Sequence, residues 1–120
     1  MIKPTEAELE ILQILWKHGS CSVRFVNDEL NKSRETGYTT TLKIMQIMFS
    51  KELLTRQEEG RYHVYQAAIS QENTQKQLLE KFVDSTFGGS TMNLVMQALG
   101  NHKASKEELE EIKKLLDGME

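Results

Sequence analysis

Apolar residues recur at helical spacing through the first 51 positions and predict three helices there. In the first stretch they form one broad face, made by Leu9, Ile11, Leu12, Leu15 and Trp16. Thr5 and Glu8 fit a capping box that begins this helix, and Gly19 ends it. The same spacing predicts a second helix, which Ser22 caps and which ends near Asn31, and a third helix over residues 38–51.

After residue 52 the pattern changes to an alternation of period two, which is typical of strands. Residues 53–58 and 61–66 both alternate, which predicts a β-hairpin closed around Glu59 and Gly60. Residues 20–22 form a connector short enough to pair as a brief strand. Three helices followed by a hairpin is the order of a winged helix-turn-helix, in which the third helix enters the DNA major groove and the hairpin is the wing.

From Ser70 onward apolar residues again recur at helical spacing and predict three more helices. The helices are separated by a break at Gly88–Gly89 and by Gly100, and Ser105 with Glu108 fits another capping box. Their apolar stripes contain Leu78, Phe82, Met92, Val95, Met96, Leu99, Ile112 and Leu116. Three short helices are too small to bury such stripes alone, so they either cover the first part of the chain or pair with a second copy.

These patterns together predict a mainly α fold with a small β-hairpin wing. We expect a winged-helix DNA-binding domain at residues 1–70 and a helical dimerisation domain at residues 71–120. The stripes of the second domain are then its dimer interface.

Composition narrows the class of protein. The chain has 120 residues, of which 38% are hydrophobic and 28% charged, as in soluble globular domains. No apolar run is long enough to cross a membrane, and the first residues lack the apolar segment of a secretory signal. The single cysteine, Cys21, cannot form an intramolecular disulfide and is interpreted as a small buried apolar residue. We therefore expect a cytoplasmic protein.

Charge bears directly on nucleic-acid binding. The net charge of −3 argues against a general nucleic-acid binder. Residues 38–51 nevertheless contain two lysines and no acidic residue. This segment has two interpretations, because it is apolar nearly all round: it is a plain core helix, or it is a recognition helix.

The recognition-helix interpretation identifies specific side chains. Thr, Gln and Lys can contact base edges or phosphates, and basic residues on a wing meet phosphates. The predicted DNA contacts are therefore Thr39, Thr40, Lys43 and Gln46 on the third helix and Arg56 and Arg61 at the hairpin.

Catalytic and metal-binding interpretations find little support. His18, His63 and His102 are isolated from acidic or cysteine partners at ligand spacing, and Gly88–Gly89 reads as a helix break and not as a phosphate-binding loop. We expect no enzyme activity, no metal and no cofactor.

Several short segments of the chain match a known protein family, and their order and spacing make the match specific. They are residues 5–16 (TEAELEILQILW), 38–41 (YTTT), 51–56 (KELLTR), 60–65 (GRYHVY), 87–90 (FGGS) and 94–95 (LV). Over nearly its whole length the chain resembles the penicillinase-repressor family of bacterial winged-helix regulators. The resemblance implies a homodimeric repressor of palindromic operator DNA. It also implies release by proteolysis of the C-terminal domain, triggered by a membrane-bound sensor metalloprotease, with the matching bond at Gln97–Ala98.

The chain departs from this family in three ways. It lacks the paired C-x-C motifs of the copper-responsive branch. Leu42, Gln46 and Ile47 stand where members of the resistance branch often have arginines, and Gln97–Ala98 stands where that branch is cut between Asn and Phe. A winged-helix adaptor that binds proteins and not DNA is the alternative function.

Overall fold

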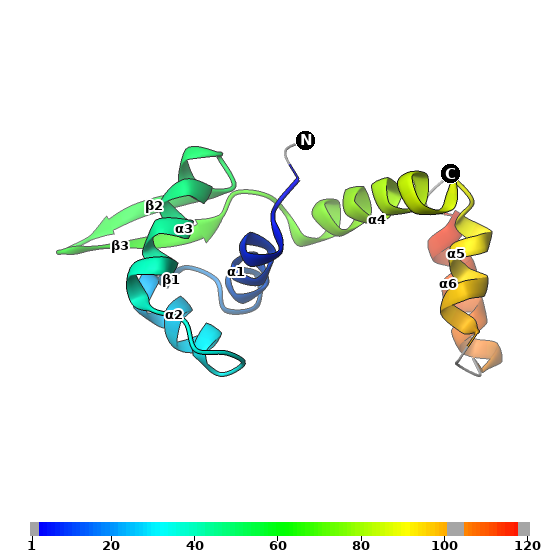
Figure 1. The fold of residues 1–120 in the computed structure, drawn as a ribbon, viewed down its shortest axis with the longest axis horizontal. Coiled ribbons are helices and arrows are strands. Elements are labelled where there is room, and N and C mark those ends of the chain that lie inside the picture. Colours follow the sequence, from blue (N-terminus) through cyan, green and yellow to red (C-terminus); the bar gives the residue numbers. More distant parts are fainter. Residues whose placement is uncertain (1–2, 101–104, 118–120) are drawn as a thin grey trace. The chain divides into compact units, whose positions relative to one another are not determined.

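The computed structural model describes residues 3–100 and 105–117, apart from the side chains of residues 109 and 115–117. It divides into two compact units, Met1–Thr74 and Gln75–Glu120 (Figure 1). The elements in chain order are α1 (Glu6–His18), β1 (Cys21–Ser22), α2 (Val23–Asn31), α3 (Tyr38–Ser50), β2 (Leu54–Glu59), β3 (Tyr62–Ala67), α4 (Gln71–Phe87), α5 (Thr91–Leu99) and α6 (Lys106–Asp117).

The first two helices begin at side-chain caps, as the sequence predicts. The Thr5 hydroxyl accepts from the Glu8 backbone N–H at 3.1 Å, and the Glu8 carboxylate accepts from the Thr5 N–H at 2.9 Å. The Ser22 hydroxyl accepts from the Phe25 N–H at 3.1 Å and starts α2. Each cap satisfies backbone donors that have no partner inside the helix, so local sequence fixes where α1 and α2 begin.

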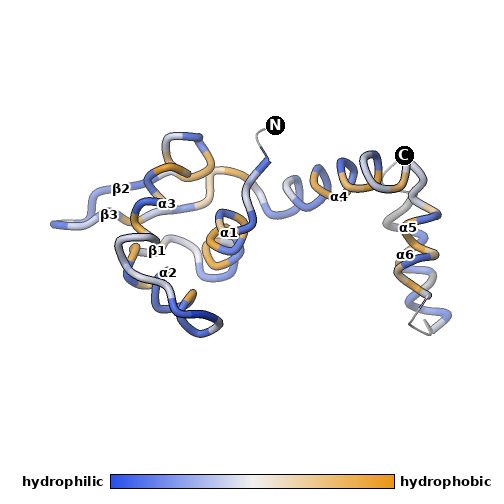
Figure 2. Tube along the Cα trace, in the orientation of Figure 1, coloured by the Kyte–Doolittle hydropathy of each residue, from blue (hydrophilic) through white to orange (hydrophobic). Residues whose placement is uncertain are grey.

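The strands form a small antiparallel sheet in the order β1-β3-β2. The brief strand expected at residues 20–22 is confirmed, since Cys21 pairs with Tyr65. The predicted position of the hairpin turn was wrong by one residue, because Glu59 still pairs with Tyr62 and the turn is made by Gly60 and Arg61. Gly60 has a φ of 63°, which favours glycine. The hairpin projects beyond the helices as a wing (Figure 1), and its tip is hydrophilic (Figure 2).

One hydrophobic core joins the three N-terminal helices to the sheet. Its buried members are Ile11, Leu12, Leu15, Cys21, Val23, Val26, Leu30, Met45, Met48, Leu53, Leu54 and Tyr65. Burial raises the pKa of the Cys21 thiol, and the negative charge of Glu29 adds to this effect. The architecture is a winged helix-turn-helix, and the predicted fold class is confirmed.

Two asparagines hold the loop between α2 and α3. The Asn27 amide donates to the Thr36 carbonyl at 2.9 Å and to the buried Thr41 hydroxyl at 2.8 Å. Asn31 donates to the same Thr36 carbonyl at 2.9 Å and accepts from the Thr36 N–H at 3.0 Å. This polar network fixes the turn and therefore the direction in which α3 leaves it.

The second unit consists of residues 75–87 of α4 followed by α5 and α6. Gly88 and Gly89, with φ values of 59° and 85°, end α4, and the Gly89 N–H donates to the Val83 carbonyl at 3.1 Å. Ser105 and Glu108 form the predicted capping box of α6. Over the described residues, no helix is both long and apolar enough to span a membrane.

Candidate nucleic-acid interface

One face of α3 is exposed and mostly polar. At 100° per residue, its members lie within about 60° of Lys43. They are Thr39, Thr40, Lys43, Gln46, Ile47 and Ser50, and all six are exposed. Thr41, Met45 and Met48 lie on the opposite side and are buried. The helix therefore packs into the core on one side and leaves a mostly polar strip uncovered on the other, which is compatible with both interpretations of α3.

The predicted contact residues on α3 thus lie on a single surface. Thr39, Thr40, Lys43 and Gln46 are exposed there, and within the described part of the chain none of their side chains forms a hydrogen bond or ion pair. Their donors and acceptors are available to an external partner.

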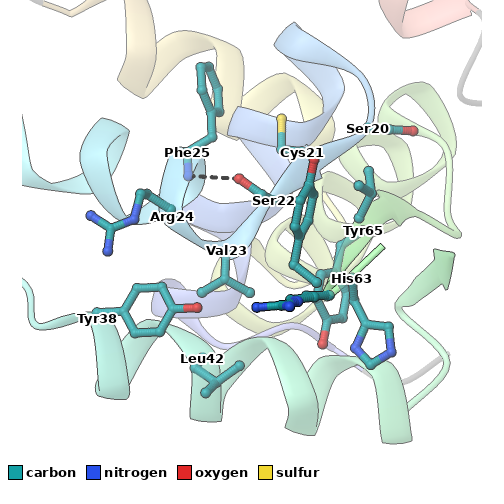
Figure 3. Close-up of a pocket in the computed structure, with 13 residues that line it drawn as sticks. Ser20, Cys21, Ser22, Val23, Arg24, Phe25, Tyr38, Leu42, His63 and Tyr65 are labelled. Atoms are coloured by element: carbon teal, nitrogen blue, oxygen red, sulfur yellow. Dashed lines mark hydrogen bonds between the residues drawn. The ribbon is translucent and has the colours of Figure 1, made fainter. Parts of the chain in front are cut away.

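A groove of about 670 Å³ lies beside α3, between the start of α2 and strand β3. Tyr38 and Leu42 stand on α3 at one side, Val23 faces them from α2, and His63 comes from the wing (Figure 3). Arg24 also lines the groove, and its guanidinium lies 5.6 Å from the centre of the Tyr38 ring. Apolar walls with basic groups at the rim suit an anionic partner with an apolar or sugar-like body.

The two wing arginines occupy different positions. Arg56 is exposed on β2, and its guanidinium stacks over the Phe49 ring of α3 at 4.0 Å from the ring centre. This contact places a cation at the junction of α3 and the wing. Arg61 lies in the hairpin turn, not on the strand as the alternation predicted, and it lines the groove.

The cations at this surface make no ion pairs within the described chain. They are Lys43, Arg24, Arg56 and Arg61. By contrast, ion pairs link Lys32 to Glu29, Arg34 to Glu10 and Lys51 to Glu8. Cations without an intramolecular ion pair therefore occur at α3, the groove and the wing, where β2 also carries Glu58 and Glu59, although the whole chain is acidic.

Sequence reasoning missed two residues of this surface. Arg24 lies in the first turn of α2, where a cation meets the positive end of the helix dipole. That unfavourable placement is a signal for an anionic partner. Ile47 was not among the predicted contact residues, but it is 43% exposed on the same face as Lys43. Its position four residues after Lys43 is the signal that could have found it.

The second unit exposes much of its predicted apolar stripe. Phe82 is 48% exposed, Met92 62% and Met96 63%. Leu78, Val95, Leu99 and Ile112 are half-buried, and the Leu116 side chain lies outside the described residues. Of the unit's residues with a described burial, only Val83 is buried. Gln97 and Ala98 are exposed and lie within α5, in helical conformation.

No group of three or more His, Cys, Asp or Glu side chains that could hold a metal occurs among the described residues.

Known proteins are similar to this chain in sequence and in fold. The sequence pattern of the penicillinase repressors matches residues 4–118. The penicillinase repressor of Bacillus licheniformis is 27% identical over 113 residues, which cover 94% of this chain and 88% of the relative. The methicillin resistance regulatory protein MecI of Mammaliicoccus sciuri is 19% identical over 94% of this chain and 92% of its own length.

A solved structure matches part of the chain. It is the solution structure of the monomeric form of Bacillus licheniformis BlaI in complex with the blaP half-operator. The match has a TM-score of 0.52 and 29% sequence identity, and it covers 60% of this chain and 88% of that one.

Proposed function

Because the chain belongs to the penicillinase repressor family, a family of transcriptional repressors and not of enzymes, we propose that it represses transcription by occupying operator DNA. In this proposal α3 enters the major groove, the wing lies against the neighbouring backbone, and the groove beside α3 receives phosphates. The similarity to BlaI, whose structure contains a half-operator, supports this use of the fold.

The observation that carries the proposal is the exposed face of α3. The side chains of Thr39, Thr40, Lys43 and Gln46 have no intramolecular partners within the described chain. Residues 38–51 contain no carboxylate that would repel phosphate. Arg24 and Arg61 line the groove beside α3, and Arg56 stacks on Phe49 of the same helix. The arrangement separates base contacts at the centre from phosphate contacts at the rim, as DNA-binding modules do.

We propose a homodimer held together by the second unit. Phe82, Met92 and Met96 are large apolar side chains that are about half exposed or more, and solvent exposure of such side chains is unfavourable. A two-fold dimer would place two copies of α3 about 34–36 Å apart, one turn of DNA, and would select palindromic operators.

Release of the operator is proposed to follow proteolysis between Gln97 and Ala98 in the cytoplasm by a membrane-bound sensor protease. A cut there would divide the apolar stripe of α5 between Met96 and Leu99, and the two DNA-binding units would lose the avidity of linkage. Following the full-length chain in cells during induction tests this step. Persistence of the intact chain while target genes are expressed would show release by another route.

DNA binding is tested by selecting duplexes from a random library with the full-length protein and measuring affinity for the recovered sequences at several salt concentrations. Binding through phosphates weakens steeply as salt rises. A shared motif and a steep salt dependence are the expected result. If no duplex is enriched and affinity is negligible at low salt, the winged-helix unit is instead an adaptor for proteins.

A further inference from the structure

Ile47 is the one large apolar side chain on the exposed face of α3. It lies four residues after Lys43 and three before Ser50, and it is 43% exposed. The apolar residues that pack into the core, such as Met45 and Met48, lie on the opposite side. Core packing therefore does not account for an isoleucine at this position.

The polar neighbours of Ile47 limit what can cover it. Gln46 presents an amide with no partner in the described part of the chain. The Ser50 hydroxyl, by contrast, already donates to the Gln46 backbone carbonyl at 3.1 Å. Lys43 is the single charged residue of α3, and the helix has no arginine. The face therefore lacks the arginine fork that most often reads guanine, and it offers an amide beside an aliphatic group.

We infer that α3 reads neighbouring A·T base pairs, with Ile47 covering the C5-methyl group of a thymine and the Gln46 amide bonding to the N6 and N7 atoms of an adenine. This inference rests on the proposed function, in which α3 enters the major groove. Thymine is distinguished in that groove by its methyl group, and glutamine is a bidentate partner for adenine.

The surroundings of Ile47 favour DNA over a protein as the group that covers it. A protein surface packed on Ile47 would also cover Lys43, which has no carboxylate partner within the described chain, and desolvating an unpaired ammonium is costly. In the major groove the same lysine can reach a guanine or a phosphate while Ile47 meets a methyl group. The face is also continuous with the cations of the groove and the wing.

The test uses duplexes recovered from a random library with the full-length protein. Each thymine of the recovered motif is replaced in turn by deoxyuridine, which removes only the methyl group. One replacement per half-site is expected to lower the affinity of the unaltered protein about fourfold, the effect of one buried CH₂. Ile47→Ala should bind the thymine and uracil duplexes equally, whereas Ser50→Ala should keep the difference.

A parallel experiment tests Gln46. Replacing one adenine of the motif by 7-deazaadenine removes the N7 acceptor and should weaken binding by the unaltered protein but not by Gln46→Ala. A fresh selection with Ile47→Arg should exchange the thymine for guanine at the position that responds to uracil. The far-ultraviolet circular dichroism and melting temperature of each variant separate a lost contact from a lost fold.

The outcomes distinguish the inference from the function on which it rests. A motif in which no uracil replacement changes affinity, or an Ile47→Ala variant with the same thymine preference, overturns the inference and leaves DNA binding intact. Failure of the unaltered protein to bind any duplex overturns both.

Discussion

The ammonium group of Lys51 lies 2.9 Å from the carboxylate of Glu8, and this ion pair joins the C-terminal cap of α3 to the first turn of α1. The Glu8 side chain is only 4% exposed. Burial acts to raise the pKa of Glu8, but hydrogen bonds from the Thr5 N–H and Lys51, with the charge of Lys51, outweigh it, so the pKa lies below its ordinary value of 4.5.

Replacing Lys51 by methionine should destabilise the fold, because it leaves the Glu8 carboxylate buried without its counter-ion. We expect a loss of about 1–3 kcal/mol in the free energy of unfolding, measured by urea denaturation at pH 7. Lys32→Met is the matched control, since Lys32 pairs with Glu29 on the surface and should change stability by less than about 0.5 kcal/mol. Equal effects of the two variants would show that the pair does not stabilise the fold.

The lowered pKa of Glu8 also predicts how the stability of the fold depends on pH. A carboxyl group whose pKa is lowered by folding stabilises the native state above its unfolded pKa, and this contribution is lost as pH falls through the folded pKa. The unaltered protein should therefore be more stable than Glu8→Gln at pH 7. The difference in unfolding free energy should shrink below about pH 4.5. A difference that stays constant from pH 7 to pH 3 would contradict this assignment.

The hydroxyl of Thr41 donates to the Gly37 carbonyl at 3.3 Å and accepts from Asn27, so it anchors the first turn of α3. Thr41→Val keeps the shape but leaves one Asn27 N–H buried without a partner, at a cost of about 1–3 kcal/mol in unfolding free energy. Thr55→Val on exposed β2 is the control and should be close to neutral. Denaturation curves check both, and a neutral Thr41→Val would show that α3 is positioned without this network.

Local signals in the sequence predicted most of the first unit. The caps at Thr5 and Ser22 depend on residues within one helical turn, and the structure confirms both. The predicted turn at Glu59 and Gly60 was one residue too early. Strand pairing continues as far as Glu59 and Tyr62, so the turn is made by Gly60 and Arg61.

The sequence indicated the polar residues on the exposed side of α3, but it did not indicate which apolar residue lies among them. Apolar residues occur nearly all round the helix, so periodicity does not indicate which of them face α1 and α2. Packing decides this: Met45 faces the core and is buried, whereas Ile47, on the other side of the helix, is exposed. The same nonlocal information brings Arg24 beside Tyr38, fourteen positions later in the chain.

The junction between α3 and β2 contains an unfavourable backbone conformation. Glu52 has a φ of 64°, the left-handed region. The neighbouring Leu53 N–H donates to the Met48 carbonyl at 2.9 Å and the Glu52 N–H to the Phe49 carbonyl at 3.0 Å, which is the pattern of a Schellman cap. Glu52→Gly should therefore raise the unfolding free energy by about 0.5–1 kcal/mol. Glu58→Gly, within strand β2, is the control and should lower it.

Arg24 is expected to contact a DNA phosphate and not a base, so it should not discriminate between DNA sequences. With a duplex recovered from a random library, Arg24→Gln should weaken binding similarly for all sequences and reduce the slope of log affinity against log salt by about 1. Lys32→Gln also removes a cation from the α2 region, but that cation is paired with Glu29, so its slope should stay unchanged. An unchanged slope for Arg24→Gln would remove Arg24 from the interface.

The exposed methionines of α5 give a test of the dimer. Met92 and Met96 are four residues apart, so they lie on one side of α5. Replacing both by glutamate places two charges in an apolar contact, where desolvation is costly. We expect a double variant Met92→Glu, Met96→Glu to sediment as a monomer at micromolar concentration, while the unaltered chain sediments as a dimer.

The same double variant should lose most of its affinity for a palindromic duplex, by about a hundredfold, because the two DNA-binding units are no longer linked. Its affinity for a single half-site should stay unchanged, since α3 and the wing lie in the other unit. Gln97→Glu adds one charge to α5 at an already exposed polar position and is the control for charge alone. A double variant that remains dimeric would place the interface elsewhere in the chain.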